Sequence, residues 1–481
     1  MLRRTFLSSA CAAAAANSAD ATNLSPKGPR PNIVIILADD QGYGDLGCYG
    51  SPDIRTPNID RMARGGTRMT SFYAAPLCGP SRAAIMTGCY GPRVGMNTNL
   101  GPKMRFGLDP RETTLASLVK PLGYATMAIG KWHLGDRPQF LPRHYGFDSY
   151  YGLPYSNDMW PFHPKTAPQP NESPRLTAAR KRAAYTGYAG SDSYYPPGKG
   201  FPDLPLIEND EVVELNPDES RLTGNYTNRA LEFIHANRSN PFLLYLAHNM
   251  PHCPLFPGSR FAGKSLRGLY GDAVEEIDWS AGQILDLLHS LGIERNTLVV
   301  YTSDNGPWLD YGVDGGSAGP FRDGKGTTWE GGVREPGIFY WPDTIPAGHV
   351  TSEVGATIDI LPTIAEMTGA KLPNHTIDGR SLIPLLRISP QAKSPRSEHF
   401  YFNARPFGRP PGLEAVRSGP WKLRLASDGD RLRASGLYQL QEDIAERFDR
   451  AQLHPDIVQK LQATAQSFYD DMRKEIRPLA E

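Results

Sequence analysis

The chain has 481 residues, of which 40% are hydrophobic, and its 51 lysine and arginine residues balance its 51 aspartate and glutamate residues. This length allows up to three domains, and the hydrophobic content suffices for a large core. The charge balance excludes an overall positive field of the kind that attracts nucleic acids or acidic membranes. The 48 glycines and 44 prolines indicate many loops, where functional residues are commonly placed on a rigid scaffold.

The N-terminus is typical of an export signal. Arg3 and Arg4 begin a run that resembles a bacterial twin-arginine motif, and a stretch of small residues follows it. We therefore expect residues 1–21 to be a signal peptide and the mature protein to be exported, either to the periplasm or out of a bacterial cell. The alternative is a disordered start that happens to carry two arginines. No later stretch approaches the roughly 20 apolar residues of a membrane span, so we expect none.

Short, continuous apolar runs predict strands that are buried on both faces, as in a parallel sheet covered by helices. They comprise residues 32–38, 124–129, 241–247, 297–302 and 337–341. Apolar residues at helical spacing predict helices at residues 59–64, 82–86, 114–122, 224–237 and 270–291. Strands that alternate with helices indicate an α/β fold.

Two segments interrupt this alternation. Residues 155–210 are rich in Pro, Tyr and basic side chains and lack periodicity, which predicts an irregular excursion over the surface. Residues 389–397 contain two prolines and lack an apolar run, which predicts a linker. Four short strand-like segments and a helix at about residues 456–474 follow it. We therefore expect a main domain over residues 30–390 and a small C-terminal α+β subdomain over residues 398–481.

Polar side chains follow four of the predicted strands at the points where those strands end. They are Asp39 and Asp40, Lys131 and His133, His248 and His252, and Asp304 and Asn305. In open α/β sheets, ligands bind at the edge formed by the carboxyl ends of the strands. Each ending alone could be a helix cap, a turn or a surface pair. The four together predict a site at this edge.

The oxygen-bearing members of this group predict a hard metal ion. Two adjacent carboxylates such as Asp39 and Asp40 need a compensating cation when both are ionised. Together with Asp304 and Asn305 they offer only oxygen, which suits Ca²⁺, and less well Mg²⁺, rather than zinc. No third nitrogen or sulfur ligand at zinc-site spacing accompanies the two histidines that follow the third strand.

Cys78 precedes Pro80, a common first-turn residue, and a short helical stretch. We therefore expect it near a helix N-terminus, where backbone N–H groups and the helix dipole favour an anion. Arg82, about one turn further on, could hold an oxyanion or the nucleophile itself. Sulfate and phosphate esters suit this arrangement. A low-pKa redox thiol is the alternative, although no second cysteine stands at Cys-x-x-Cys spacing.

With these residues assembled, the chain resembles the type I, formylglycine-dependent sulfatases, and most closely the branch of arylsulfatase A and N-acetylgalactosamine-6-sulfatase. The run Cys78-Gly79-Pro80-Ser81-Arg82 matches the maturation signature Cys-x-Pro-x-Arg of that family. The resemblance extends from Asn32 to the C-terminal helix. Further shared runs lie at residues 38–45, 130–135, 153–156, 304–306 and 324–336.

The resemblance implies an alkaline-phosphatase-like sandwich, with a large, mostly parallel sheet between helices and a small antiparallel sheet in the C-terminal subdomain. It implies that a formylglycine-generating enzyme oxidises Cys78 to an aldehyde, whose hydrate is the nucleophile. The implied ligands of a calcium ion are Asp39, Asp40, Asp304, Asn305 and the modified Cys78. The residues implied to act on the nucleophile or the sulfate group are Arg82, Lys131, His133, Ser156, His252 and Lys325.

The implied reaction is hydrolysis of a sulfate ester in a sulfated carbohydrate or an aryl sulfate. In it, Lys131, Ser156 and Lys325 hold the sulfate oxygens. His252, helped by Lys325, protonates the leaving alcohol, and His133 takes the proton of the second hydroxyl of the hydrate. Two alternatives stay open: a phosphodiesterase or phosphonate ester hydrolase of the same superfamily, and a non-catalytic protein that binds sulfated glycans.

Overall fold

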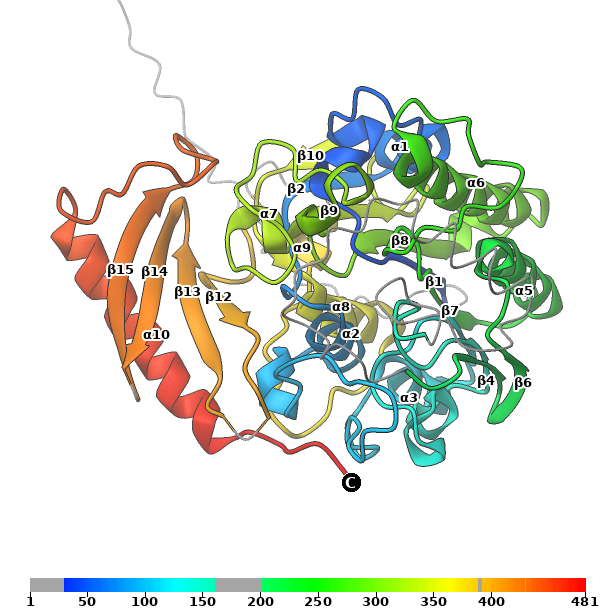
Figure 1. Cartoon of the computed structure of the whole chain (residues 1–481), viewed down its shortest axis with the longest axis horizontal. Coiled ribbons are helices and arrows are strands. Elements are labelled where there is room, and N and C mark those ends of the chain that lie inside the picture. Colours follow the sequence, from blue (N-terminus) through cyan, green and yellow to red (C-terminus); the bar gives the residue numbers. More distant parts are fainter. Residues whose placement is uncertain (1–29, 161–200, 388–391, 408, 429) are drawn as a thin grey trace, which may run out of the picture.

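The computed structural model describes residues 30–160, 201–387, 392–407, 409–428 and 430–481. The expected export signal at residues 1–21 lies outside this part of the chain and stays a prediction. The described residues form an 11-stranded sheet and a separate four-stranded sheet, which lie side by side in Figure 1. None of the described helices is long and apolar enough to cross a membrane.

The large sheet has the strand order β10-β2-β9-β8-β1-β7-β3-β4-β5-β6, with β11 paired to β2. Its centre is parallel: β1 (Asn32–Ala38) lies between β7 (Phe242–Ala247) and β8 (Thr297–Ser303), and β3 (Ala125–Gly130) pairs with β7. These are four of the five strands that the sequence predicts. They are buried along almost their whole length, which explains why their sequences are continuously apolar instead of alternating.

One edge of the large sheet has mixed strand directions. β9 (Arg334–Tyr340) runs antiparallel to both β8 and β2 (Thr67–Tyr73). The strand predicted at residues 337–341 therefore exists, but it does not belong to the parallel part of the sheet. β10 (His349–Thr351) and β11 (Gly355–Ala356) pair parallel with β2.

At the opposite edge, β4 (Ser149–Gly152) pairs parallel with β3, and β5 (Pro205–Glu208) pairs antiparallel with β4 and with β6 (Glu211–Leu215). The prediction of an irregular surface excursion over residues 155–210 is therefore wrong at its end, where β5 lies. At its start, residues 155–160 are irregular as predicted but are buried and do not run over the surface, and residues 161–200 lie outside the described part of the chain. A strand of four residues is too short to show a diagnostic alternation.

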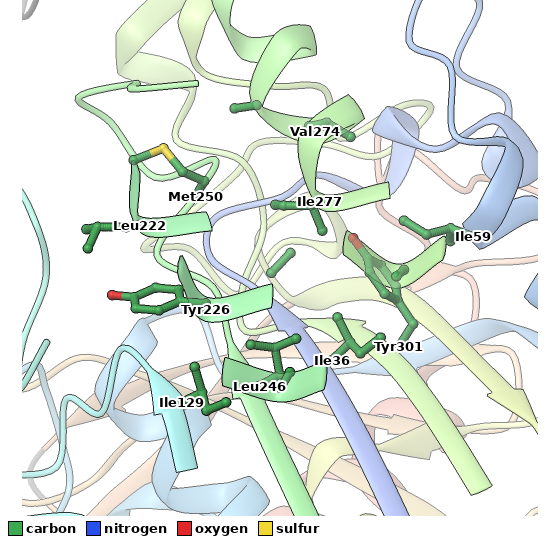
Figure 2. Packing of buried hydrophobic residues seen from close by; sticks show 14 of the residues in the cluster. Ile36, Ile59, Ile129, Leu222, Tyr226, Leu246, Met250, Val274, Ile277 and Tyr301 are labelled. Atoms are coloured by element: carbon green, nitrogen blue, oxygen red, sulfur yellow. The ribbon is translucent and has the colours of Figure 1, made fainter. Parts of the chain in front are cut away.

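Helices cover both faces of the large sheet. α1 (Pro57–Gly65), α5 (Leu222–Ala236) and α6 (Gly268–Ser290) pack on one face, and Figure 2 shows Ile277 of α6 directed at the strands. The opposite face packs against α2 (Cys78–Thr87), α3 (Leu115–Val119), α8 (Ile360–Thr368) and α9 (Ile383–Leu386).

Strand β1 shows how one apolar run serves both layers. Val34 and Ile36 belong to the hydrophobic cluster under α5 and α6, whereas Ile33 and Ile35 belong to the cluster under α2 and α8. Successive side chains of a strand point to opposite faces, so a strand in the middle layer must be apolar at every position. The sandwich of helices around a mostly parallel sheet confirms the predicted fold class.

The C-terminal region forms the small sheet. β12 (Glu398–Asn403), β13 (Gly412–Ser418), β14 (Trp421–Asp428) and β15 (Arg431–Gln439) pair antiparallel in chain order. α10 (Pro455–Lys474) lies along this sheet (Figure 1). The predicted small subdomain with an antiparallel sheet is thus present.

The two sheets share a hydrophobic cluster, to which Tyr73 of β2 and Tyr401 of β12 both belong. Residues 392–397, the described part of the predicted linker, are also held to the main body. The Ser394 hydroxyl donates to the carbonyl oxygen of Val354 over 2.6 Å, and buried Arg396 pairs with Asp359. This segment is therefore not a loose linker, and the predicted division of the chain into two domains stays a prediction.

Candidate active site

The predicted functional residues meet at one edge of the large sheet. Parallel strands β1, β3, β7 and β8 all end there, and their backbones hold the ends in register. The amide of Asp304 donates to the carbonyl oxygen of Ala38 over 3.1 Å, and the amide of Lys131 donates to that of Ala247 over 2.8 Å. The predicted side chains are all buried, except that Lys325 is partly exposed: Asp39, Asp40, Cys78, Arg82, Lys131, His133, Ser156, His252, Asp304 and Asn305.

The backbone around these strand ends is tightly constrained. Gly130, the last residue of β3, has φ +93°, and a Cβ atom there would lie 1.8 Å from the carbonyl oxygen of Ala247. Only glycine fits this position, from which the chain turns to present Lys131. Asp40 and His133 also have positive φ angles, 63° and 62°. Such conformations are costly for non-glycine residues, and they cluster at functional sites.

Cys78 is the first residue of α2, as the sequence predicts, and is fully buried. Its sulfur lies 3.4 Å from Oδ1 of Asp39 and 3.7 Å from Oδ1 of Asp40. Burial raises the pKa of this thiol well above its ordinary value, even though the charges of Lys131 and Lys325 lower it. A redox cysteine needs the opposite shift, so the burial of Cys78 argues against that alternative.

Arg82 lies one turn further along α2 and is also fully buried. The sequence predicts that it contacts an oxyanion or the nucleophile. In the structure, its Nε and Nη2 donate to Oδ2 of Asp304 over 3.0 and 2.8 Å, and its Nη1 donates to the carbonyl oxygen of Lys131 over 2.5 Å. Arg82 therefore orients a carboxylate and the backbone that carries a lysine.

Two lysines each bind one of the adjacent carboxylates. Nζ of Lys131 lies 2.6 Å from Oδ2 of Asp39, and Nζ of Lys325 lies 2.7 Å from Oδ2 of Asp40. Burial lowers the pKa of each lysine, but the charge of its aspartate partner outweighs this and raises the pKa. Both lysines are therefore ammonium ions. Nζ of Lys131 also donates to the hydroxyl oxygen of Ser156 over 3.2 Å.

The ring of His252 is held in one tautomer. Its Nδ1 lies 2.6 Å from the carbonyl oxygen of Cys253, which can only accept, so Nδ1 carries the hydrogen. Nε2 is then an acceptor, and the hydroxyl of Ser156 at 3.1 Å and Nζ of Lys325 at 3.0 Å both donate to it. Burial lowers the pKa of His252, and the charge of Lys325 lowers it further. The ring is therefore neutral.

His133 is held in the opposite tautomer. Its Nε2 lies 3.1 Å from the carbonyl oxygen of Leu100 and therefore donates to it. Its buried Nδ1 has no hydrogen-bond partner among the described residues. Burial lowers the pKa of this imidazole as well, followed by the charge of Lys131. His133 is thus a neutral base whose accepting nitrogen is free.

A buried cysteine at a helix N-terminus, set among paired carboxylates and lysines, agrees with comparisons to known proteins. The family model described as Sulfatase matches residues 31–370 of the chain. The chain belongs to the sulfatase family. It is therefore a hydrolase of sulfuric esters, which confirms the resemblance seen in the sequence.

Relatives match this sulfatase over most of its length. Human arylsulfatase A is 42% identical over 405 residues, which cover 83% of this chain and 75% of that protein. The N-acetylgalactosamine-6-sulfatase of Rattus norvegicus is 42% identical over 369 residues, 74% of this chain and 66% of that protein. The crystal structure of the PsFucS1 sulfatase from Pseudoalteromonas sp. has a TM-score of 0.77 at 27% identity, covering 94% of this chain and 92% of that chain.

The oxygen set predicted from the sequence shares Asp39 and Asp40 with a second group, whose side chains the structure brings close enough together to hold a metal ion. In the oxygen set, the amide of Asp40 donates to Oδ1 of Asp304 over 3.1 Å, and Nδ2 of Asn305 donates to Oδ1 of Asp40 over 2.7 Å. Oδ1 of Asn305 is buried and has no partner among the described residues. The second group comprises Asp39, Asp40, Cys78 and His252, whose ligand atoms lie within 4.8 Å of one another.

The structure adds Trp308 to the residues around the site. Nζ of Lys325 lies 4.1 Å from the centroid of its ring, close enough for a cation–π interaction, and the ring centroid of His252 lies 5.4 Å from it. The sequence carries no signal for this residue. Its position depends on how the loop after β8 folds back over the loop of Lys325.

Proposed function

We propose that this sulfatase hydrolyses the sulfate ester of a sulfated carbohydrate or an aryl sulfate, with Cys78 as nucleophile after its oxidation to formylglycine. The observation that carries the proposal is the position of the Cys78 sulfur, within 3.4 and 3.7 Å of carboxylate oxygens of Asp39 and Asp40. Each of these carboxylates is also bound by a lysine. A nucleophile at this point faces both a cation site and a site for an anion.

We further propose that the cofactor is a calcium ion held by Asp39, Asp40, Asp304 and Asn305, with the modified Cys78 completing the set. Oδ1 of Asn305 supports this choice, because it is a buried oxygen that accepts no hydrogen bond from the described residues. Oxygen donors of this kind suit calcium.

The group that includes His252 is a poorer fit to a metal ion. Nε2 of His252 already accepts hydrogen bonds from Ser156 and Lys325, while Nδ1 carries a hydrogen. The oxygen set is therefore the better candidate.

The charges of the site support an anionic substrate. Three carboxylates and three basic groups balance one another without a metal: Asp39, Asp40, Asp304, Arg82, Lys131 and Lys325. A bound divalent cation would leave this buried region net positive, which attracts a sulfate monoester. It would also favour the ionised form of the attacking hydroxyl and neutralise charge on the sulfate oxygens.

The protein side chains bind the sulfate group and transfer the protons. Lys131, Ser156 and Lys325 present hydrogen-bond donors that can stabilise the sulfate oxygens as charge shifts during the reaction. Lys325 and His252 share one proton across a 3.0 Å contact, and we propose that this proton reaches the leaving alcohol. His133, whose Nδ1 is free, takes the proton of the second hydroxyl of the hydrate, which allows sulfate to leave.

The test is mass spectrometry of the peptide that spans Cys78, combined with sulfate release. We expect an aldehyde at residue 78 in protein produced together with a formylglycine-generating enzyme. Cys78→Ser should remain folded but lose nearly all turnover, because a serine adduct has no second hydroxyl to expel the sulfate. A fully active enzyme with an unmodified thiol, or an active Cys78→Ser variant, would overturn the proposal.

The substrate class is proposed from the names of the relatives, which include an arylsulfatase and an N-acetylgalactosamine-6-sulfatase. A panel of sulfated saccharides, 4-nitrophenyl sulfate and an aryl phosphodiester tests it. We expect release of sulfate to be faster than phosphodiester cleavage. The reverse order would favour the phosphodiesterase alternative.

We also propose that residues 1–21 direct export of the enzyme to the periplasm or beyond, on the support of the Arg3-Arg4 motif. Cell fractionation of wild-type protein and of an Arg3→Lys, Arg4→Lys variant tests this. Wild-type protein that stays in the cytoplasm would contradict it.

A further inference from the structure

We infer that the C-terminal sheet positions Lys325, and that Lys422 on β14 is the residue through which it does so. The inference rests on the proposed role of Lys325 at the leaving group. Lys422 is a fully buried lysine in a sheet that contributes none of the predicted site residues. A buried lysine is rare unless it is paired, so its partners indicate its function.

The loop that carries Lys325 is fixed to the large sheet on one side. The amide of Lys325 donates to the carbonyl oxygen of Pro307 over 3.0 Å, in the loop after β8. The amide of Gly326 donates to the carbonyl oxygen of Pro76 over 2.8 Å, just before α2 and Cys78. These two bonds set the path of the backbone on both sides of the ammonium-bearing residue.

On its other side, the loop enters α7 (Glu330–Val333), and Glu330 is the centre of a buried charge cluster. The Glu330 carboxylate accepts hydrogen bonds from the hydroxyl of Tyr73 over 2.6 Å, from Nζ of Lys422 over 2.9 Å and from Nη1 of Arg334 over 3.1 Å. Burial alone would raise its pKa, but the charges of Lys422 and Arg334 outweigh burial and lower it. Glu330 is thus ionised and held by groups from both sheets.

Lys422 bridges Glu330 to a second buried carboxylate. Its Nζ also lies 2.9 Å from Oε1 of Glu446, which follows β15, and Oε2 of Glu446 accepts a hydrogen bond from the amide of Glu330 over 2.7 Å. Glu446 therefore holds the first amide of α7, while Lys422 holds Glu446 and the Glu330 side chain together. Without the ammonium group, two carboxylates would face each other in a buried space, and one of them would have to move or take up a proton.

Two residues between Lys325 and Glu330 are attached to the same sheet. The hydroxyl of Thr328 donates to Oε2 of Glu414 over 2.8 Å and accepts from Nη1 of Arg424 over 2.6 Å. The centroid of the Trp329 ring lies 3.6 Å from Cζ of Arg322 and 4.2 Å from Cζ of Arg424, which belongs to β14. Three consecutive residues, 328 to 330, are thus attached to the C-terminal sheet, three to five positions after Lys325.

The experiment uses the full-length matured enzyme and two substrates that differ in their need for a proton at the leaving oxygen. One is 4-nitrophenyl sulfate, whose leaving group is good, and the other is a carbohydrate or alkyl sulfate, whose leaving group is poor. Lys325→Ala provides the reference. We expect it to reduce kcat much more on the poor leaving group, because general acid catalysis contributes roughly 10²–10⁴-fold where a proton is required.

The variant that tests the inference is the double substitution Lys422→Met with Glu446→Gln, which removes one positive and one negative charge together. We expect kcat on the poor leaving group to fall by about tenfold to a hundredfold, in keeping with the cost of a misplaced catalytic group. The loss on 4-nitrophenyl sulfate should be several times smaller. Thr328→Val, which leaves the charge cluster intact, should shift the two rates in the same direction by a smaller factor. Lys460→Met, on the exposed face of α10, is the control and should change neither rate.

The outcomes separate the inference from the proposed function. If the double variant and Thr328→Val lose activity equally on both substrates, or lose none, while Lys325→Ala discriminates between the substrates, the positioning role is wrong. If Lys325→Ala itself does not discriminate, the proposed role of Lys325 at the leaving group fails, and the inference fails with it.

Discussion

The ammonium group of Lys325 lies 3.0 Å from Nε2 of His252, whose Nδ1 donates to the carbonyl oxygen of Cys253 over 2.6 Å. The ring is neutral, so the proton between the two residues resides on Lys325. Nε2 of His252 can become protonated by taking this proton. In the proposed reaction the two residues therefore act as one acid, and neither is expected to act fully without the other.

This pairing predicts that His252→Ala and Lys325→Ala are not additive. Each substitution alone should lower kcat on a carbohydrate sulfate by about 10²-fold or more. The double variant should lose little beyond the larger single effect, because both residues serve the same proton transfer. The measurement is a double-mutant cycle in kcat. Losses that multiply in the double variant would show that the two residues act independently.

The end of β3 predicts a large difference between two glycine substitutions. Gly130→Ala places a Cβ atom 1.8 Å from a carbonyl oxygen, in addition to the strain of φ +93°. We expect it to lower the free energy of unfolding by at least about 3 kcal/mol and to abolish activity by displacing Lys131. Gly123→Ala is the matched control, since φ is +83° but nothing lies within 4 Å of the added atom. Gly123→Ala should lower the free energy of unfolding by about 1 kcal/mol, because only backbone strain opposes it. Urea unfolding distinguishes the two, and equal costs would contradict the steric argument.

Glu276 on α6 predicts a pH dependence of stability. Burial raises the pKa of this carboxyl from 4.5 to about 7, although the amide of Gly258 donates to it over 2.8 Å. Between these two values the folded protein binds more protons than the unfolded chain, so the free energy of unfolding falls as pH rises from about 4.5 to 7 and then levels off.

Glu276→Gln removes this titration and keeps an oxygen acceptor for Gly258. The variant should gain stability relative to wild type by on the order of 2 kcal/mol between pH 5 and pH 8, as measured by urea unfolding at each pH. Glu232→Gln, at a solvent-exposed position of α5, serves as the control and should show no such trend. A constant difference between Glu276→Gln and wild type across this range would contradict the prediction.

The proposed metal site predicts that calcium stabilises the folded enzyme. A ligand that binds only the folded state at about 100 times its Kd adds about 2.7 kcal/mol, so calcium should raise Tm and a chelator should lower it. Asn305→Ala should weaken this shift, because the buried Oδ1 is one of the proposed ligands. Asp286→Asn, at an exposed position, should keep the full shift. Differential scanning calorimetry measures both, and a wild-type Tm that is insensitive to calcium and to chelation would contradict the proposal.

Much of the site is visible in the sequence because each central strand is an apolar run that ends in polar residues. Ala38 is followed by Asp39, and Gly130 by Lys131, and parallel strands bring such ends to one edge. Strand β2 cannot be predicted in this way, because polar residues such as Arg68 and Thr70 interrupt its apolar run. Strand β5 is too short to show a pattern. Strand direction is equally hidden, since β9 has the composition of a buried strand but runs antiparallel.

Contacts between distant positions are the part that the sequence does not reveal. Arg82 binds Asp304 across 222 positions, and Lys422 binds Glu330 across 92 positions. Nothing in a local pattern specifies such pairs, because they depend on how whole elements pack. For the same reason the sequence does not reveal that the guanidinium group of Arg82 binds the carboxylate of Asp304.

The complete burial of Cys78 imposes an order on the assembly of this enzyme. In the folded protein its side chain is 0% exposed, and several charged groups around it, Lys131, Asp304 and Lys325, belong to segments that are synthesised later than Cys78. The oxidation proposed above therefore requires the maturation enzyme to reach Cys78 before those segments fold over it. If folding were completed first, the proposal predicts a correctly folded protein that stays inactive. The yield of active enzyme would then depend on the relative rates of folding and oxidation.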